Sequence, residues 1–476
     1  MRYTEKYEAV IGIEVHARLA TRSKIFCSCS TRFGAPANTQ VCPVCMGLPG
    51  ILPVLNREAV RLAVIAGIAT NCSISRVIRF DRKNYFYPDL PKAYQITQND
   101  EPLCRDGYLD VCVNGSPRRI GIQRIHMEED AGKLAHVEGV GTLVDYNRCG
   151  LPLIEIVSRP DIRSTEEAKT YLTELRSVLL YAGVSDCKMN EGSFRCDVNL
   201  SVRKTGETAL GVRTEMKNIN SFAFVAKAIE YEFERQASAL ERGETILPET
   251  RRFDETDGKT YPMRSKETAA DYRFFSEPDL APFELDQSFI EAQRQEMPPL
   301  PADIRRIYTE EYGLSAADAE IIISHPQTSR YFSETVKHCK HPKTAANIMI
   351  SRLLTDARAD EFSPSVTPEQ LGEITELFAQ DMINSSTVKT LLTKLQDSEL
   401  SPREFVEKQG LWQINDEETL RAVVLDVIKA FPKLINDYKN GKTAARQAII
   451  GKVMAATNGK ANPVVVNAIL SETYYD

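Results

Sequence analysis

Residues 7–16 read YEAVIGIEVH, a run of mostly apolar residues that ends in a glutamate and a histidine. Short runs rich in Val and Ile are typical of buried β-strands. GLPLIEIV at 150–157 and CDVNLSV at 196–202 are runs of the same kind, and turn-forming or charged residues separate them. The sequence therefore predicts a strand-rich region up to about residue 295.

Helices interrupt this region. Helix-spaced apolar residues predict one over 56–70. Ser164-Thr165-Glu166-Glu167 is a capping box, which predicts the start of another because the Ser hydroxyl and the Glu carboxylate satisfy exposed backbone donors. The N-terminal part is thus predicted to be mixed α and β.

The remainder of the chain is predicted to be helical. Met297-Pro298-Pro299-Leu300-Pro301 fixes several backbone angles and removes amide donors, so it indicates a linker. Beyond it, capping boxes with Pro at the first helical position begin at Thr367 and Ser401. We expect an α+β fold, with a large mixed domain over 1–295 followed by all-α domains over 296–405 and 406–476.

Composition excludes several classes of protein. The 476 residues carry a formal net charge of -7, which excludes a globally basic nucleic-acid coat protein. The longest apolar run, 62–69, is far too short to cross a bilayer, and the first ten residues lack the apolar core of a signal peptide. We therefore expect a cytoplasmic protein without a membrane partner, whose 11 cysteines are reduced thiols or metal ligands.

Four of these cysteines form two close pairs. Cys27 and Cys29 make a C-x-C motif, and Cys42 and Cys45 make a C-x-x-C motif after a turn that contains Gly and Pro. Four thiolates suit a tetrahedral zinc ion and leave no open position for a substrate, so the pattern predicts a structural zinc site. The alternative is four unconnected thiols.

Acidic residues at strand ends suggest a second ion site. Glu14 and His16 share one face of the first strand because side chains alternate along a strand. Three acids end the run RIHMEED at 124–130, and Glu155 lies inside an apolar strand, where an unpaired charge is unfavourable. Carboxylates with one histidine favour Mg²⁺ or Mn²⁺ over zinc. Solvated acids in salt bridges are the alternative.

Nucleotide-binding signals are mixed. Residues 81–95 mix cations with aromatic residues in a segment bent by prolines. Such a segment can stack on a base and hold phosphate, or it can be a loop that packs its own tyrosines. Two Gly-Lys-Thr triplets lack the upstream glycine of a P-loop, since Phe253 and Asn436 occupy those positions. If the protein uses ATP, it does so without that motif.

Longer motifs carry a resemblance to a known family. They are GIEVH (12–16), KIFCSCSTRFG (24–34), VCPVCMGLPGILPVLN (41–56), FDRKNYFYPDLPKAYQI (80–96), HMEEDAGK (126–133), LPLIEIVSRPDIR (151–163) and NGKANPVVVNAIL (458–470). In this order they resemble the family of B subunits of aspartyl/glutamyl-tRNA(Asn/Gln) amidotransferases, and the resemblance covers nearly the whole chain.

The resemblance implies an activity and partners. Members of that family act in a glutamine-hydrolysing carbon–nitrogen ligase that converts Glu-tRNA(Gln) or Asp-tRNA(Asn) to Gln-tRNA(Gln) or Asn-tRNA(Asn). ATP phosphorylates the side-chain carboxylate, and ammonia channelled from a separate amidase (glutaminase), the A subunit, replaces the phosphate, while the small C subunit completes the assembly. The first domain is expected to resemble the catalytic fold of glutamine synthetase. A noncatalytic zinc-containing tRNA-binding subunit and a self-sufficient ammonia-dependent ligase are the alternatives.

The resemblance also implies residue roles. It assigns a catalytic Mg²⁺ centre to His16, Glu129 and Glu155, with Glu14 and Glu128 as further ligands or channel residues. The resemblance also places four more residues at the border of the kinase pocket that binds ATP: Lys83, Tyr85, Tyr87 and Lys92. The zinc site occurs in only some members, and all four of its cysteines are present here.

The C-terminal segment 429–460 is locally basic. It contains seven cations and one acid, Asp437, in a chain that is acidic overall. A cationic surface neutralises phosphates, so we expect the tail domain from about residue 406 to bind tRNA. The alternative is a solvated helix face.

Overall fold

The computed structural model describes residues 3–265, 272–354, 362–439 and 442–474. The chain forms two compact units, Met1–Pro301 and Ala302–Asp476. The proline-rich segment 297–301 lies at their junction. The two units have different architectures, so the α+β fold class is confirmed.

The first unit is built on a nine-stranded sheet with the order β14-β13-β12-β11-β1-β10-β7-β6-β2. All neighbouring strands are antiparallel except β12 and β13, which are parallel. Its strands are β1 (Tyr7–Arg18), β2 (Ser73–Ile74), β6 (Cys104–Val113), β7 (Ser116–Glu129), β10 (Pro152–Ser158), β11 (Phe194–Lys204), β12 (Thr214–Ile219), β13 (Glu249–Asp254) and β14 (Lys259–Ser265). The three runs singled out in the sequence are thus neighbouring strands.

Three smaller sheets surround this one. One has the order β15-β4-β5, one pairs β16 with β3, and one is the hairpin β8-β9. Their strands are β3 (Val77–Ile78), β4 (Asp81–Asn84), β5 (Tyr94–Thr97), β8 (Lys133–Val137), β9 (Gly141–Asp145), β15 (Phe275–Ser276) and β16 (Phe283–Glu284).

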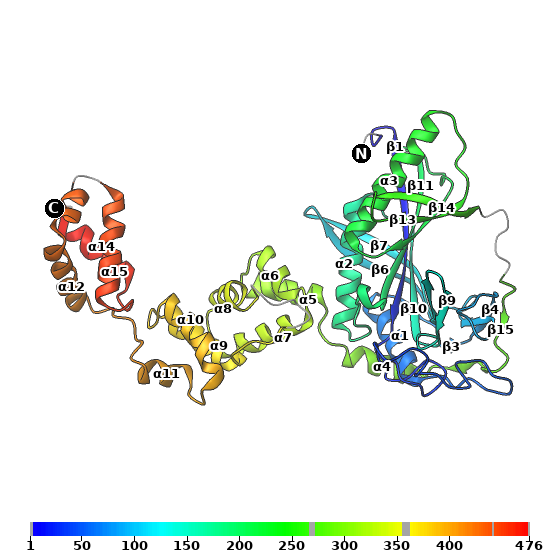
Figure 1. The fold of residues 1–476 in the computed structure, drawn as a ribbon, viewed down its shortest axis with the longest axis horizontal. Helices are drawn as coiled ribbons and strands as arrows, with labels where there is room; N and C mark the ends of the chain where they lie inside the picture. Colours follow the sequence, from blue (N-terminus) through cyan, green and yellow to red (C-terminus); the bar gives the residue numbers. More distant parts are fainter. Residues whose placement is uncertain (1–2, 266–271, 355–361, 440–441, 475–476) are drawn as a thin grey trace. The chain divides into compact units, whose positions relative to one another are not determined.

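Helices cover one face of the large sheet. They are α1 (Arg57–Ala69), α2 (Thr165–Tyr181) and α3 (Phe222–Glu241), which pack on β6, β7 and β11 (Figure 1). Along β1 the buried apolar residues include Ile11, Ile13 and Val15, whereas Glu14 and His16 point to the opposite face. This alternation leaves the other face of the sheet for polar side chains.

The predicted starts of α1 and α2 are confirmed, but the Glu167 contact at the start of α2 differs from the predicted one. Asn56 caps α1, and Ser164 caps α2 by accepting a hydrogen bond from the amide of Glu167. The Glu167 carboxylate accepts from the amide of Arg163, one residue before the cap, and so completes the motif differently from a standard capping box.

The second unit is helical. Both predicted capping boxes, at Thr367 and Ser401, form with their prolines at the first turn. Helix α4 (Gln287–Glu296) precedes the linker. The α-helices that follow are α5 (Pro301–Arg306), α6 (Ala316–Ile323), α7 (Pro326–Thr335), α8 (Pro342–Ile348), α9 (Pro368–Ala379), α10 (Ser385–Lys394), α11 (Pro402–Lys408), α12 (Glu417–Ala430), α13 (Pro432–Lys439), α14 (Thr443–Ala456) and α15 (Pro463–Tyr474).

The expected boundary at residue 405 falls inside α11, whose Phe405 and Val406 are buried and which packs on α9. The last four helices enclose their own apolar core, from Leu420 to Leu470. Within the described residues, no helix is both long enough and apolar enough to cross a membrane.

Candidate functional site

The polar face of the large sheet carries a row of facing charged residues. The register pairs His16 of β1 with Glu155 of β10 on one side and Arg195 of β11 on the other. Glu155 in turn faces His126 of β7. Residues that pair across antiparallel strands point to the same face, so four separate segments converge on one patch.

His16, Glu128 and Glu155 form the centre of this patch. Nε2 of His16 lies 3.4 Å from Oε1 of Glu128 and 3.3 Å from Oε2 of Glu155. One ligand atom from each residue can be chosen so that all lie within 4.8 Å of one another. Two carboxylates and one imidazole suit Mg²⁺ or Mn²⁺, so the donor set fits the ion expected from the sequence.

Mutual contacts set the charges of this group. Burial alone would raise the pKa of Glu155, but hydrogen bonds from His126 and His16 outweigh it and hold the pKa well below its usual range. Burial lowers the pKa of His16, yet its hydrogen bond to Glu155 and the nearby charges raise it to about 9. These contacts favour a proton on His16, and a divalent ion must displace that proton to use the ring nitrogen.

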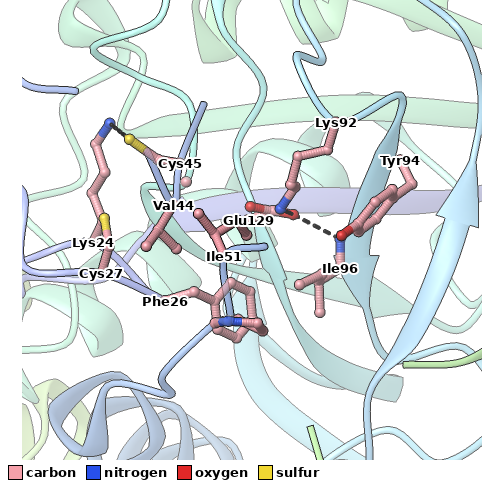
Figure 2. A pocket seen from close by; sticks show the side chains of 12 residues that line it. Lys24, Phe26, Cys27, Val44, Cys45, Ile51, Lys92, Tyr94, Ile96 and Glu129 are labelled. Carbon is pink, nitrogen blue, oxygen red and sulfur yellow. Dashed lines mark hydrogen bonds and ion pairs between the residues drawn. The ribbon is translucent and has the colours of Figure 1, made fainter. Parts of the chain in front are cut away.

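Glu129 is not brought into this group. It pairs with Pro152 of β10, so its side chain leaves the sheet on the face opposite to Glu128. There it forms a buried ion pair with Lys92 and accepts a hydrogen bond from the Ile96 amide at 2.9 Å (Figure 2). The structure thus separates Glu129 from His16 and Glu155, with which the sequence motifs had grouped it.

Glu14 belongs to a neighbouring group instead. It shares a second cluster of possible ligand atoms with Asp197 and Glu215, and its Oε1 accepts from Asn199 at 2.7 Å. Lys217 places its ammonium 2.8 Å from Asp197 and 2.9 Å from Glu215. Burial and the charge of Glu155 raise the pKa of Glu14. A side-chain cation is therefore already paired with two acids of this cluster.

The segment from Lys83 to Lys92 is divided between two environments. The ammonium of Lys83 lies 5.1 Å from the ring centre of Tyr272 and 5.7 Å from that of Tyr85. Tyr87 is exposed, beside Phe86, which is 91% exposed. Tyr85 thus packs within the loop, whereas Phe86 and Tyr87 remain available for stacking.

The four paired cysteines come together. One sulfur atom from each of Cys27, Cys29, Cys42 and Cys45 lies within 4.8 Å of the others. The amide of Cys42 donates to Sγ of Cys45 at 3.2 Å. A hydrogen bond from Cys27 is the main cause that lowers the pKa of Cys45, and the Lys24 ammonium lowers it further. A compact set of four sulfurs suits tetrahedral zinc, which would cross-link the loop and take no part in the chemistry.

We expect purified protein to contain one zinc ion per chain at these four cysteines. Cys42→Ser should lower both zinc content and the melting temperature, because the ion cross-links two loop segments. Elemental analysis and thermal unfolding measure the two effects, and Cys112→Ser, which replaces an exposed cysteine elsewhere, is the control. Zinc-free wild-type protein of full stability would contradict the assignment.

His126 was not singled out by the sequence pattern. Its Nε2 lies 3.4 Å from Oε2 of Glu155, and its Nδ1 is buried without a hydrogen-bond partner among the described residues. The signal was present, since His126 and Glu128 are two residues apart and must share a strand face.

Fold and site together define an α+β protein with a carboxylate–histidine group on the polar face of a large, mostly antiparallel sheet, joined to a helical unit. Residues 9–291 match the GatB/GatE catalytic domain, and residues 330–473 match the GatB domain. The chain belongs to the GatB/GatE family.

Three curated relatives are each named as the B subunit of an aspartyl/glutamyl-tRNA(Asn/Gln) amidotransferase. The chain is 50% identical to that of Caldicellulosiruptor saccharolyticus, with 98% of this chain and 99% of the relative covered. It is 51% identical to the protein of Thermoanaerobacter pseudethanolicus, with the same coverage. For Brevibacillus brevis the identity is 48%, with 98% of each chain covered.

Proposed function

We propose that this chain is the amidating subunit of a glutamine-hydrolysing ligase that converts Glu-tRNA(Gln), Asp-tRNA(Asn) or both to the amidated forms. The observation that carries the proposal is the His16, Glu128 and Glu155 group on the sheet of a GatB/GatE catalytic domain. The cytosol is the proposed compartment, since thiols stay reduced there.

The proposed chemistry has two steps. A side-chain carboxylate oxygen of the aminoacyl-tRNA attacks the γ-phosphorus of ATP, which gives an acyl phosphate and ADP. Ammonia then attacks the activated carbonyl carbon, phosphate leaves, and the nitrogen loses a proton. Activation is required because a free carboxylate is a poor electrophile.

His16, Glu128 and Glu155 would hold Mg²⁺, which neutralises charge on a transferring phosphoryl group. His126 supports the site by donating to Glu155, which fixes the orientation of that carboxylate. The buried Lys92 and Glu129 pair lies on the opposite face of the sheet, and we propose that it borders the route by which ammonia arrives.

We further propose that residues 1–295 share the catalytic fold of glutamine synthetase. An antiparallel sheet with helices on one face and acids on the other supports this. Residues 296–410 would form a helical domain, and the last four helices, α12 to α15, would bind the tRNA. The proposed protein partners are the amidase (A) and small (C) subunits of the same ligase.

Co-expression with candidate amidase and small subunits provides the test. The purified complex should amidate at least one of the two mischarged tRNAs when ATP and glutamine are both supplied, and should release ADP in step with the product. Replacing glutamine with ammonium chloride should preserve amidation, because the reaction at this site consumes ammonia. A complex that binds the tRNA yet forms neither ADP nor amidated product would contradict the proposal.

A further inference from the structure

Lys24 is a fully buried lysine without a carboxylate partner. Its exposed fraction is 0%, and no carboxylate oxygen lies within 4.0 Å of its ammonium among the described residues. Its ammonium donates instead to Sγ of Cys45 at 3.6 Å and to the carbonyl of Tyr146 at 3.3 Å. Burying an ammonium is unfavourable unless a negative group compensates it, so the position requires an explanation.

The backbone holds Lys24 in this place. Its amide donates to the Cys29 carbonyl at 2.9 Å, and its carbonyl accepts from the Asn56 side chain at 3.2 Å. Ile25, the next residue, donates its amide to the carbonyl of Gly150 at 3.0 Å. These backbone hydrogen bonds of Lys24 and Ile25 therefore fix the position from which the Lys24 side chain reaches Cys45.

Among the described residues around Lys24, the four thiolates are the negative group that is not already paired with another cation. Figure 2 shows that the same tight pocket contains Lys24, Lys92, Glu129 and Cys45. Glu129 is already paired with Lys92. A zinc ion with four thiolates has a net charge of about −2, by simple addition of one −1 per sulfur to +2. The thiolate centre is thus the group that can balance the Lys24 charge.

We propose that Lys24 is the buried counter-cation of a zinc–thiolate centre at Cys27, Cys29, Cys42 and Cys45, and that its hydrogen bond to Cys45 stabilises the bound ion. Lys24 is a positioning residue that acts through a ligand and does not touch the ion. Groups of this kind commonly change metal affinity by about 10- to 100-fold when removed. The inference rests on zinc occupancy and is independent of the amidation chemistry.

The four cysteines also lie close to the Lys92 and Glu129 pair. A Cβ on Gly150 would lie 3.6 Å from Cβ of Cys45 and from Cδ of Lys24, and 3.9 Å from Oε2 of Glu129. Gly47, in the loop after Cys45, lies against Lys92, since a Cβ there would be 3.2 Å from its Cα. The loop that zinc would cross-link therefore forms one wall of the pocket that holds the pair.

The test compares zinc release from the full-length protein and two neutral variants, Lys24→Met and Lys24→Gln. Zinc content is measured first, and then the rate of release to an excess of a chromogenic chelator. We expect release to accelerate by about tenfold or more in both variants. Arg22→Met is the matched control, because it removes an exposed cation two residues away and should release zinc at the wild-type rate.

Cobalt substitution separates this role from a general loss of stability. The sulfur-to-cobalt charge-transfer band should shift in the Lys24 variants, because a thiolate that loses a hydrogen bond becomes a stronger donor. If Lys24→Met fails to fold, the shorter and polar Lys24→Gln is the variant to measure. Wild-type release rates with an unshifted band in either folded variant would overturn the inference. Zinc-free wild-type protein would overturn both this inference and the zinc site.

Discussion

Glu155→Gln should lower ATP-dependent amidation on the order of 100-fold or more, the largest effect that we expect from a single substitution. Glutamine keeps the shape of the side chain but removes the charge that both His16 and His126 contact. ADP formation should fall in parallel. Hydrolysis of glutamine by the amidase partner should change much less, so the two reactions are measured separately in the same complex.

A matched pair of variants tests which neighbouring acid belongs to the ion site. Glu128→Gln should weaken Mn²⁺ binding, measured by electron paramagnetic resonance, because Glu128 lies 3.4 Å from His16. Glu129→Gln should leave Mn²⁺ affinity close to wild type, because Glu129 points to the other face and contacts Lys92. The opposite result would show that Glu129, and not Glu128, binds the ion together with His16 and Glu155. Normal amidation in a folded Glu155→Gln complex would refute the mechanism.

Ending the chain after Gly410 should reduce tRNA affinity by about tenfold or more at low salt, the second large effect. This cut preserves α11, which supplies buried Phe405 and Val406 to the preceding helices. Phosphate contacts release counterions, so the affinities of the full and shortened complexes should converge as salt rises. Filter binding across a salt series measures this. A folded, shortened complex with unchanged affinity at every salt concentration would refute a tRNA-binding tail.

The structure shows which of the basic residues are available to an RNA. Lys433 and Lys452 are exposed, and the ammonium of Lys452 lies 4.7 Å from the ring centre of Phe431. Arg446 instead donates to the carbonyl of Asn467 and to the hydroxyl of Ser471, 2.9 Å away, which ties α14 to α15. Replacing Lys433 and Lys452 with Ala should reduce the salt slope by about one per lost contact, and Arg446→Ala serves as the structural comparison.

Local features of the sequence were sufficient to predict the helices and strands named above and the gathering of the four cysteines. The apolar run in YEAVIGIEVH identified a strand, and the caps at Ser164, Thr367 and Ser401 placed helix starts, because both depend on contacts within a few residues. The spacing of the cysteines predicted their cluster, since one short turn is enough to bring the C-x-C and C-x-x-C motifs together.

Long-range pairing was decided only by the tertiary structure. Adjacent acids at 128 and 129 look alike in the sequence, and only the register between β7 and β10 shows which of them shares a face with His16. A bulge at Val157 and Ser158 shifts that register, and a shift of one residue would exchange the two faces.

By itself, then, the sequence determined the fold class, the element starts, the family motifs and the residue types available for an ion or a nucleotide. The tertiary structure alone showed that His126 joins Glu155, that Glu129 lies with Lys92, and that Lys24 is buried against Cys45. The physical reason is that these contacts join residues 21 to 37 positions apart. The pairing of His16 with Glu155 joins residues 139 positions apart (155 − 16). Their geometry depends on strand register and on the packing of the whole sheet, and neither is encoded in a short stretch of chain.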